Sequence, residues 1–230
     1  MATIDQNQLD ALLVRLRVIP RFADFENFEA AFAAVAAERA AAVAEMRAAG
    51  ADALFPLLVP MLAGDAAARS TACEVILKVD AERGMEFVLP LLNDPDDNVR
   101  YIACECLAEL GGKGAVPTLL SVLRSHPDTS LRCTAARGLG LQGGPDVIPA
   151  LLTAMASDQE FDDQGYSPSH CASMALDDVL GTEETRLRFG SVCRLPDRKP
   201  DLDRLRRLAE ERYRQWQADT VSSDEAAGGT

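Results

Sequence analysis

The sequence predicts an all-α protein, a right-handed α-solenoid of stacked helical hairpins with atypical capping helices at both ends. Three observations predict this class. First, 31 residues separate Arg69 from Arg100 and 32 separate Arg100 from Arg132, each in a similar sequence context, and a fixed period in this range is typical of stacked-helix arrays. Second, apolar residues recur at helical spacing without the alternation of strands. Third, 48% of the 230 residues are hydrophobic but only 5% are aromatic, which suits closely packed helices.

Residues 1–50 are expected to form N-terminal capping helices. A first helix is predicted over Thr3–Val18, with Asp5 near its start. A long alanine-rich helix or helix pair follows over Phe25–Ala49, and Gly50 ends it. Neither segment matches the repeated pattern, and an atypical terminal unit is expected where a solenoid must cover one apolar end.

Residues 51–181 are expected to hold four helix–turn–helix repeats. Each has an apolar first helix, a short turn, an arginine just inside the second helix, and an alanine- and cysteine-containing second run. The repeats span about residues 54–79, 85–111, 117–141 and 149–181. In the fourth repeat Ser169 occupies the arginine position, and the connection between the helices is about five residues longer.

Residues 182–218 are expected to form an irregular connection and then a C-terminal capping helix. Asp201–Ala218 is amphipathic, with leucines, Tyr213 and Trp216 on one side. A partner-docking helix is the alternative, because Trp and Tyr with Arg are residue types that anchor interfaces. Residues 219–230 are small, polar and acidic, and are expected to be disordered.

Two segments of the central repeats carry a resemblance to a known family. They are Asp94–Arg100 followed by Ala103 and Leu107, and Pro127–Arg132 followed by Ala135, Ala136 and Leu139. Both resemble the HEAT repeat, in particular the short bacterial variety called phycobilisome-lyase-like, and the likeness covers roughly residues 54–181. The resemblance implies the solenoid fold, and a protein that binds other proteins.

The repeated Asp and Arg are expected to be structural. The carboxylate before each second helix can cap it by accepting from free backbone N–H groups. Each arginine can reach the turn of a neighbouring repeat, so that a column of Asp–Arg contacts fixes the stacking; a basic recognition ladder is the alternative. The residues of this column are Asp65, Asp96 and Asp128 with Arg69, Arg100 and Arg132.

Charge and hydropathy limit the classes of partner. The formal net charge is −13, whereas affinity for nucleic acid comes from clustered Lys and Arg. A basic protein partner is therefore expected, and nucleic acid is not. No apolar run approaches the length of a membrane span, and the N-terminus lacks a secretory pattern. We expect a monomeric, bacterial, cytoplasmic protein with no membrane interaction.

No catalytic residue, metal or cofactor is expected. The di-iron hydroxylases of HEAT-like architecture need repeated His-Glu pairs, but His126 precedes Pro127 and His170 precedes Cys171. His170 and Cys171 diverge by about 100° on a helix and cannot form a nucleophile pair. The six cysteines are interpreted as reduced packing residues. The alternative function is a lyase-like HEAT-repeat enzyme or enzyme subunit acting on a chromophore or protein substrate.

Two surfaces are predicted to bind a partner. In HEAT-like arrays the second helices line the concave face, and here they carry an acidic stripe: Glu74, Glu105, Glu109, Asp177 and Asp178. The other surface is the insert of the fourth repeat: Asp158, Glu160, Phe161, Asp162, Asp163 and Tyr166. Insertions in repeat arrays often lie on the binding face. The expected function is a non-catalytic protein–protein interaction scaffold, as an adaptor or as an immunity-type inhibitor of a basic protein.

Overall fold

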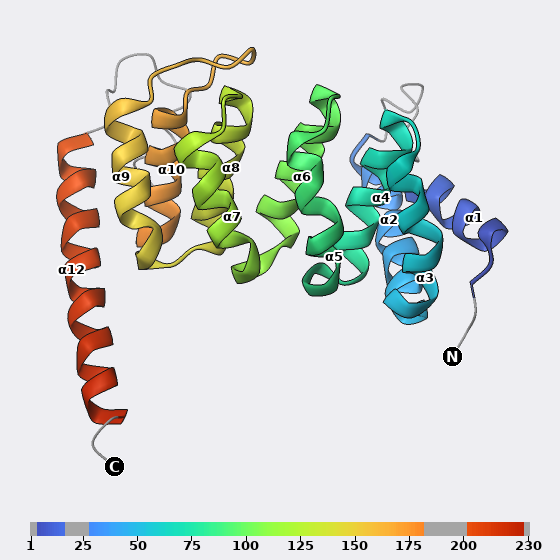
Figure 1. Ribbon diagram of the computed structural model, residues 1–230, viewed down its shortest axis with the longest axis horizontal. Coiled ribbons are helices and arrows are strands. Elements are labelled where there is room, and N and C mark those ends of the chain that lie inside the picture. Colours follow the sequence, from blue (N-terminus) through green and yellow to red (C-terminus); the bar gives the residue numbers. More distant parts are fainter. Residues whose placement is uncertain (1–3, 17–27, 182–201, 228–230) are drawn as a thin grey trace. The chain divides into compact units, whose positions relative to one another are not determined.

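A computed structural model describes residues 4–16, 28–181 and 202–227, and the regular structure within these ranges is helical (Figure 1). The predicted all-α class of stacked helical hairpins is confirmed. The chain divides into two compact units, Met1–Ala103 and Cys104–Thr230. The division falls inside one helix, α6 (Asp97–Leu110), and each unit is described by itself.

The first unit begins with two capping helices, α1 (Gln6–Leu16) and α2 (Phe28–Ala49). Asp5 starts α1 through a reciprocal pair of hydrogen bonds: its carboxylate accepts from the Gln8 N–H at 2.8 Å, and its own N–H donates to the Gln8 side chain at 2.9 Å. Such a capping box satisfies two backbone donors that a helix start leaves open. The described part of the predicted N-terminal cap is therefore helical, and residues 17–27 lie outside the described residues.

The repeats of the first unit are hairpins whose first helix tightens into a 3₁₀ turn. Their elements are α3 (Ala51–Leu58), η2 (Val59–Ala63), α4 (Ala66–Val79), α5 (Ala81–Val88), η3 (Leu89–Asn93) and the start of α6. Pro60 and Pro90 stand at the start of the two 3₁₀ segments. Proline has no N–H for an i→i−4 bond, so the α-helical pattern ends there.

A continuous apolar core holds the first unit together. Leu54, Leu58 and Ile76 are fully buried between the helices of the hairpins. The Phe55 and Phe87 rings meet edge to face, with centroids 5.6 Å apart and an interplanar angle of 82°, which is a favoured geometry for aromatic pairs. The apolar positions of the repeat thus form the contacts between successive hairpins.

The second unit holds two further hairpins and a terminal helix. Its elements are the end of α6, α7 (Gly112–Ser125), α8 (Thr129–Gln142), η4 (Pro145–Val147), α9 (Ile148–Ser157), α10 (Pro168–Leu180) and α12 (Leu202–Ala227). A Cβ on Gly138 would lie 2.5 Å from the Ala108 Cβ, and a Cβ on Gly140 would lie 2.8 Å from the Ala175 Cα. Glycine on α8 therefore lets the second helices of neighbouring repeats approach closely.

These close contacts define the register of the fourth repeat. Gly138 of α8 packs against Ala108 in the preceding second helix, and Ala175 of α10 packs against Gly140 of α8. Gly138 lies six residues after Arg132, and Ala175 lies six residues after Ser169. Equivalent packing therefore places Ser169 at the arginine position of the repeat.

Helix α12 lies beside α9 and α10 and extends beyond them (Figure 1). Leu205 and Ala209 of this helix are buried. The helix continues to Ala227, whereas disorder was expected from Asp219 onward. In this part of the helix, the Thr220 hydroxyl donates to the Trp216 carbonyl at 2.8 Å. The predicted irregular connection, residues 182–200, lies outside the described residues.

None of the described helices is by itself long and apolar enough to cross a membrane. The segments Ala33–Ala49 and Ala51–Ala63 meet the criterion only as a pair, across a bend of 106°.

Candidate functional site

The three repeated aspartates cap helices. Asp65 accepts from the Ala68 N–H at 2.8 Å, and Asp96 accepts from the Val99 N–H at 3.1 Å. Asp128 accepts from two N–H groups at the start of α8, at 2.9 and 3.4 Å. The contacts satisfy backbone donors that the first turns of α4, α6 and α8 would otherwise leave open. The capping role predicted for these carboxylates agrees with this geometry.

Arg69 binds a carboxylate of the neighbouring repeat, but not the one predicted. Arg69 holds Asp94 with two hydrogen bonds, Nε to Oδ2 at 2.8 Å and Nη2 to Oδ1 at 2.7 Å, and donates to the Gly64 carbonyl at 2.8 Å. Asp94 lies in the turn of the next repeat, two residues before the capping Asp96. Arg69 therefore reaches the turn of the next repeat, as predicted, but it binds Asp94 there rather than the capping Asp96.

Arg132 repeats the arrangement of Arg69 in the second unit. Its Nε and Nη2 bind the two carboxylate oxygens of Asp158 at 2.7 and 3.2 Å. Arg100 differs: it donates to the carbonyl of Asp94 at 2.8 Å and pairs with Asp97 at 2.5 Å.

The Arg69–Asp94 pair predicts a pH-dependent contribution to stability. The hydrogen bond from Arg69 holds the pKa of Asp94 below its usual range, against the opposing effect of burial. Because the folded pKa lies below the unfolded value of about 3.9, the pair stabilises the fold above that pH, and this stability is lost as the pH falls toward the folded pKa.

Asp94→Asn is expected to lower the melting temperature at pH 6 and to flatten its decline between pH 5 and pH 3. Thermal unfolding across this range measures both effects, with Asp163→Asn, an exposed carboxylate of the insert, as the matched control. Equal destabilisation by Asp94→Asn at every pH would contradict the assignment.

Hydrogen bonds join the two ends of the insert between α9 and α10. Ser169 donates its N–H to the Asp158 carbonyl at 2.9 Å and its hydroxyl to the Met155 carbonyl at 2.7 Å. The Gln159 side chain donates to the Ser169 hydroxyl at 2.9 Å. Ser169 is buried, so at the position of the repeat arginine a small side chain holds together the two ends of the loop.

Asp162 organises the tip of the insert. Its carboxylate accepts from the N–H groups of Gln164 and Tyr166 at 2.9 and 2.8 Å. Its own N–H donates to the Tyr166 carbonyl at 2.7 Å, and its carbonyl accepts from the Gly165 N–H at 3.0 Å. Gly165 has a φ of 81°, a conformation that glycine adopts without steric cost. The tip is therefore a compact turn.

The acids of the insert mostly bind within the protein, and its aromatic side chains face outward. Arg132 donates to Glu160 at 2.7 Å as well as to Asp158, and this hydrogen bond holds the pKa of Glu160 below its usual range. Asp163 is exposed, and Phe161 is 70% exposed. Tyr166 is 47% exposed and stacks on His170, with ring centroids 6.3 Å apart. Of the six residues predicted in the insert, Phe161, Asp163 and Tyr166 are exposed, as is Glu160, which Arg132 binds.

The predicted acidic stripe is interrupted. Glu105 is half-buried, whereas Glu109 and Asp178 are exposed. Asp177 is 5% exposed, so it faces the core rather than solvent. Glu74 lies in the first unit, where it pairs with Lys78. Within the second unit, Glu109 and Asp178 are therefore the exposed carboxylates of the predicted stripe.

The described cysteines are buried free thiols, in agreement with their interpretation as packing residues. Burial raises the pKa of Cys104 to about 12. A hydrogen bond between the thiols of Cys133 and Cys171 raises the pKa of Cys133 and lowers that of Cys171. Within residues 4–16, 28–181 and 202–227, no group of three or more His, Cys, Asp or Glu could hold a metal ion.

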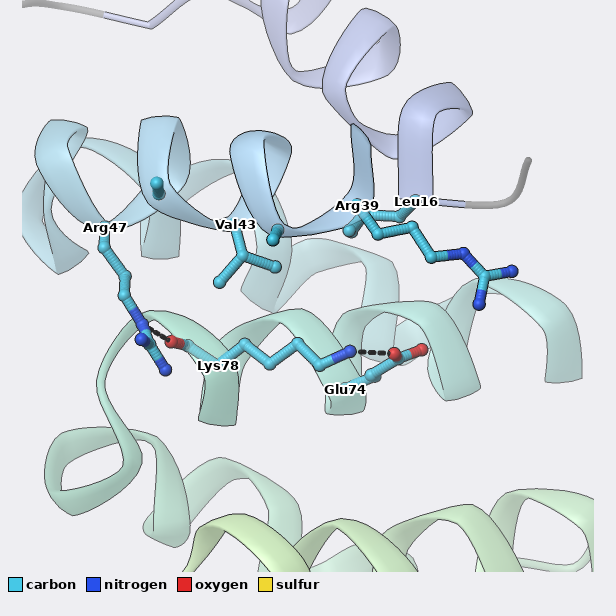
Figure 2. Close-up of a pocket in the computed structure, with 8 residues that line it drawn as sticks. Leu16, Arg39, Val43, Arg47, Glu74 and Lys78 are labelled. Carbon is cyan, nitrogen blue, oxygen red and sulfur yellow. Dashed lines mark hydrogen bonds and ion pairs between the residues drawn. The ribbon is translucent and has the colours of Figure 1, made fainter. Parts of the chain in front are cut away.

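The structure also contains a groove that was not singled out from the sequence. It lies between α2 and α4 in the first unit and has a volume of about 590 Å³ (Figure 2). Its lining residues are Leu16, Arg39, Ala40, Val43, Ala44, Arg47, Glu74 and Lys78. The spacing of Arg39, Val43 and Arg47, at i, i+4 and i+8, places them on one helix face. Because alanines surround them, these residues resembled an ordinary solvated face.

The fold and these sites define a helical-repeat protein built from hairpins, in which aspartate caps the second helices α4, α6 and α8. A family model for HEAT repeats matches residues 85–164. This part of the chain therefore consists of HEAT repeats, as the resemblance of its central segments implied.

The remaining comparisons are with curated proteins and with solved structures. No curated protein matches the chain. Among solved structures, an engineered protein from the Northeast Structural Genomics Consortium is similar, with 18% sequence identity and a TM-score of 0.47. The match covers 94% of this chain and 93% of that one.

Proposed function

We propose that this protein is a non-catalytic interaction scaffold that binds its protein partner through the insert of the fourth repeat. HEAT repeats commonly serve as protein-interaction scaffolds. The observation that carries the proposal is the outward placement of Phe161 and Tyr166 on a loop held by Arg132 and Ser169. An adaptor and an immunity-type inhibitor would both depend on such a contact.

The insert has the physical properties of a pre-organised binding loop. Aromatic side chains are enriched among the residues that dominate binding energy, since each buries a large area. Tyr166 is already restrained by stacking on His170, and the turn at Asp162 restrains the backbone beneath it. A loop that is ordered before binding loses less conformational entropy when the partner docks.

The partner that fits this surface has an apolar pocket with a basic rim. Phe161 would fill the pocket, and the exposed carboxylate of Asp163 beside it favours a basic neighbour. The net charge of −13 would also steer a basic protein toward the chain, because long-range attraction raises association rates. Charge thus guides the encounter, while the aromatic side chains supply most of the affinity.

Affinity purification from the native lysate, followed by titration of the recovered partner, tests the proposal. Phe161→Ala is expected to weaken binding by about 2 kcal/mol, which is roughly thirtyfold in Kd. Leu141→Ala is the matched control, because Leu141 is 62% exposed on α8, outside the insert. If Leu141→Ala abolishes binding and Phe161→Ala does not, the partner contacts the second helices and the insert proposal is wrong.

The lyase-like alternative is tested on the same material. A scaffold of the kind proposed is expected to purify without visible absorbance. A bound chromophore would overturn the non-catalytic function.

A further inference from the structure

The groove between α2 and α4 has an apolar floor between two arginines. Val43 of α2 points toward α4, with Arg39 and Arg47 on either side of it along α2 (Figure 2). Arg39, Ala40, Ala44 and Arg47 are exposed, and Val43 is half-buried. The floor therefore exposes small apolar side chains along about two turns of α2, where another element could pack.

Charge in the groove is opposite in sign to that of the whole chain. Three basic residues and one carboxylate line it, whereas the net charge of the protein is −13. Glu38 and Glu45 of α2 are bound on another face by Arg15, at 2.5 and 2.8 Å. These two carboxylates of α2 are therefore bound by Arg15 outside the groove.

Two of the basic side chains are held in place. The Nε of Arg47 donates to the Lys78 carbonyl at 2.7 Å, which ties α2 to the end of α4. Lys78 extends along α4 to pair with Glu74 (Figure 2). A guanidinium anchored through Nε keeps its Nη groups in a fixed place, and arginine binds carboxylates through such planar donors.

The spacing of the charges fits a helix. Arg39 and Arg47 are eight residues apart on α2, which is about 12 Å along the helix axis. A third helix lying over two neighbouring helices packs at an interaxial distance of about 8–10 Å and interdigitates its side chains with theirs. Acidic residues seven or eight positions apart on that helix would reach both arginines, and small apolar residues between them would cover Val43 and Ala44.

We infer that this groove binds an acidic amphipathic helix of a partner protein, with its carboxylates on Arg39 and Arg47 and its apolar face on Val43. The site is separate from the insert and belongs to the other unit. It would give the scaffold a second docking position with the opposite preference for charge, so that one chain could hold an acidic and a basic partner.

Selection from a displayed library of helical peptides against the full-length chain tests the inference. Enriched peptides are expected to carry Asp or Glu seven or eight residues apart, flanking small apolar residues. They should bind Arg39→Glu/Arg47→Glu at least tenfold more weakly than the wild type, and should bind Arg124→Glu, an exposed site on α7, with unchanged affinity. Ala44→Glu, a single exposed change, serves as a second variant if the double variant does not fold.

Several outcomes would overturn the inference. These are enrichment of peptides without the acidic pair, equal binding to wild type and Arg39→Glu/Arg47→Glu, or no enrichment at all. A wild-type dimer in sedimentation that dissociates in the double variant would assign the groove to a second copy of this chain. Phe161→Ala must leave the selected peptides bound, so this test can fail independently of the proposed function.

Discussion

Gly138→Ala is expected to destabilise the second unit by about 2 kcal/mol, although alanine is the better helix former by about 1 kcal/mol. The added Cβ would lie 2.5 Å from the Ala108 Cβ and 2.8 Å from its Cα. Backbone atoms cannot rotate out of the way, so α8 would have to move away from α6. The loss of packing between second helices outweighs the gain in helix propensity.

The only tryptophan of the chain, Trp216, belongs to the second unit, so urea unfolding followed by its fluorescence measures the effect of Gly138→Ala there. Gly114→Ala is the matched control, because Gly114 is exposed in α7 and the change should be neutral or stabilising. Equal midpoints for the Gly138→Ala and Gly114→Ala variants would contradict the close approach of the second helices.

Arg132→Ala is expected to destabilise the second unit by about 2–3 kcal/mol, between the values for exposed and buried ion pairs. The Arg132 and Asp158 side chains are 11% and 21% exposed, so removal of the guanidinium leaves a largely desolvated carboxylate. It also removes the donors to the carbonyls of His126 and Pro127. The insert would then lose the hydrogen bonds that join Asp158 and Glu160 to α8.

Hydrogen exchange measures this loosening directly. The Ser169 amide, which donates to the Asp158 carbonyl, is expected to exchange faster in Arg132→Ala, and partner affinity should fall as the loop loses its order. Arg132→Lys should restore only part of the slow exchange at Ser169 and part of the partner affinity, since lysine cannot bind a carboxylate through two planar donors. Arg124→Ala controls for the loss of charge. Unchanged exchange at Ser169 would show that Arg132 does not hold the insert.

Features of one helix or one turn could be predicted from the sequence, because they depend on local spacing. The helical period, the caps at Asp65, Asp96 and Asp128, and the register of Ser169 are of this kind. The partner of Arg69 is not: Asp94 and Asp96 are two residues apart, and only the stacking of one hairpin on the next decides which carboxylate meets the guanidinium.

The candidate sites also divide into features that local sequence predicts and features that depend on how the helices pack. The insert was found from sequence because its length breaks the period. The binding of Asp158 and Glu160 by Arg132 was not, since it requires the position of α8. The groove was missed because the packing of α2 against α4 creates it. In the sequence Arg39 and Arg47 look like solvated arginines, because only the fold places α4 opposite them.

Because hydrogen bonds join the two ends of the insert, the structure of these ends does not depend on the residues at its tip. The Ser169 N–H lies 2.9 Å from the Asp158 carbonyl, so the chain leaves the stack and returns to it at nearly the same point. Doubling the length of a flexible loop costs only about 0.6 kcal/mol. Residues 160–166 could therefore be exchanged or lengthened while α9 and α10 keep their packing. The two helices of the fourth repeat can therefore carry different loops without changing their own packing. New binding specificities could evolve, or be engineered, by replacing the loop alone.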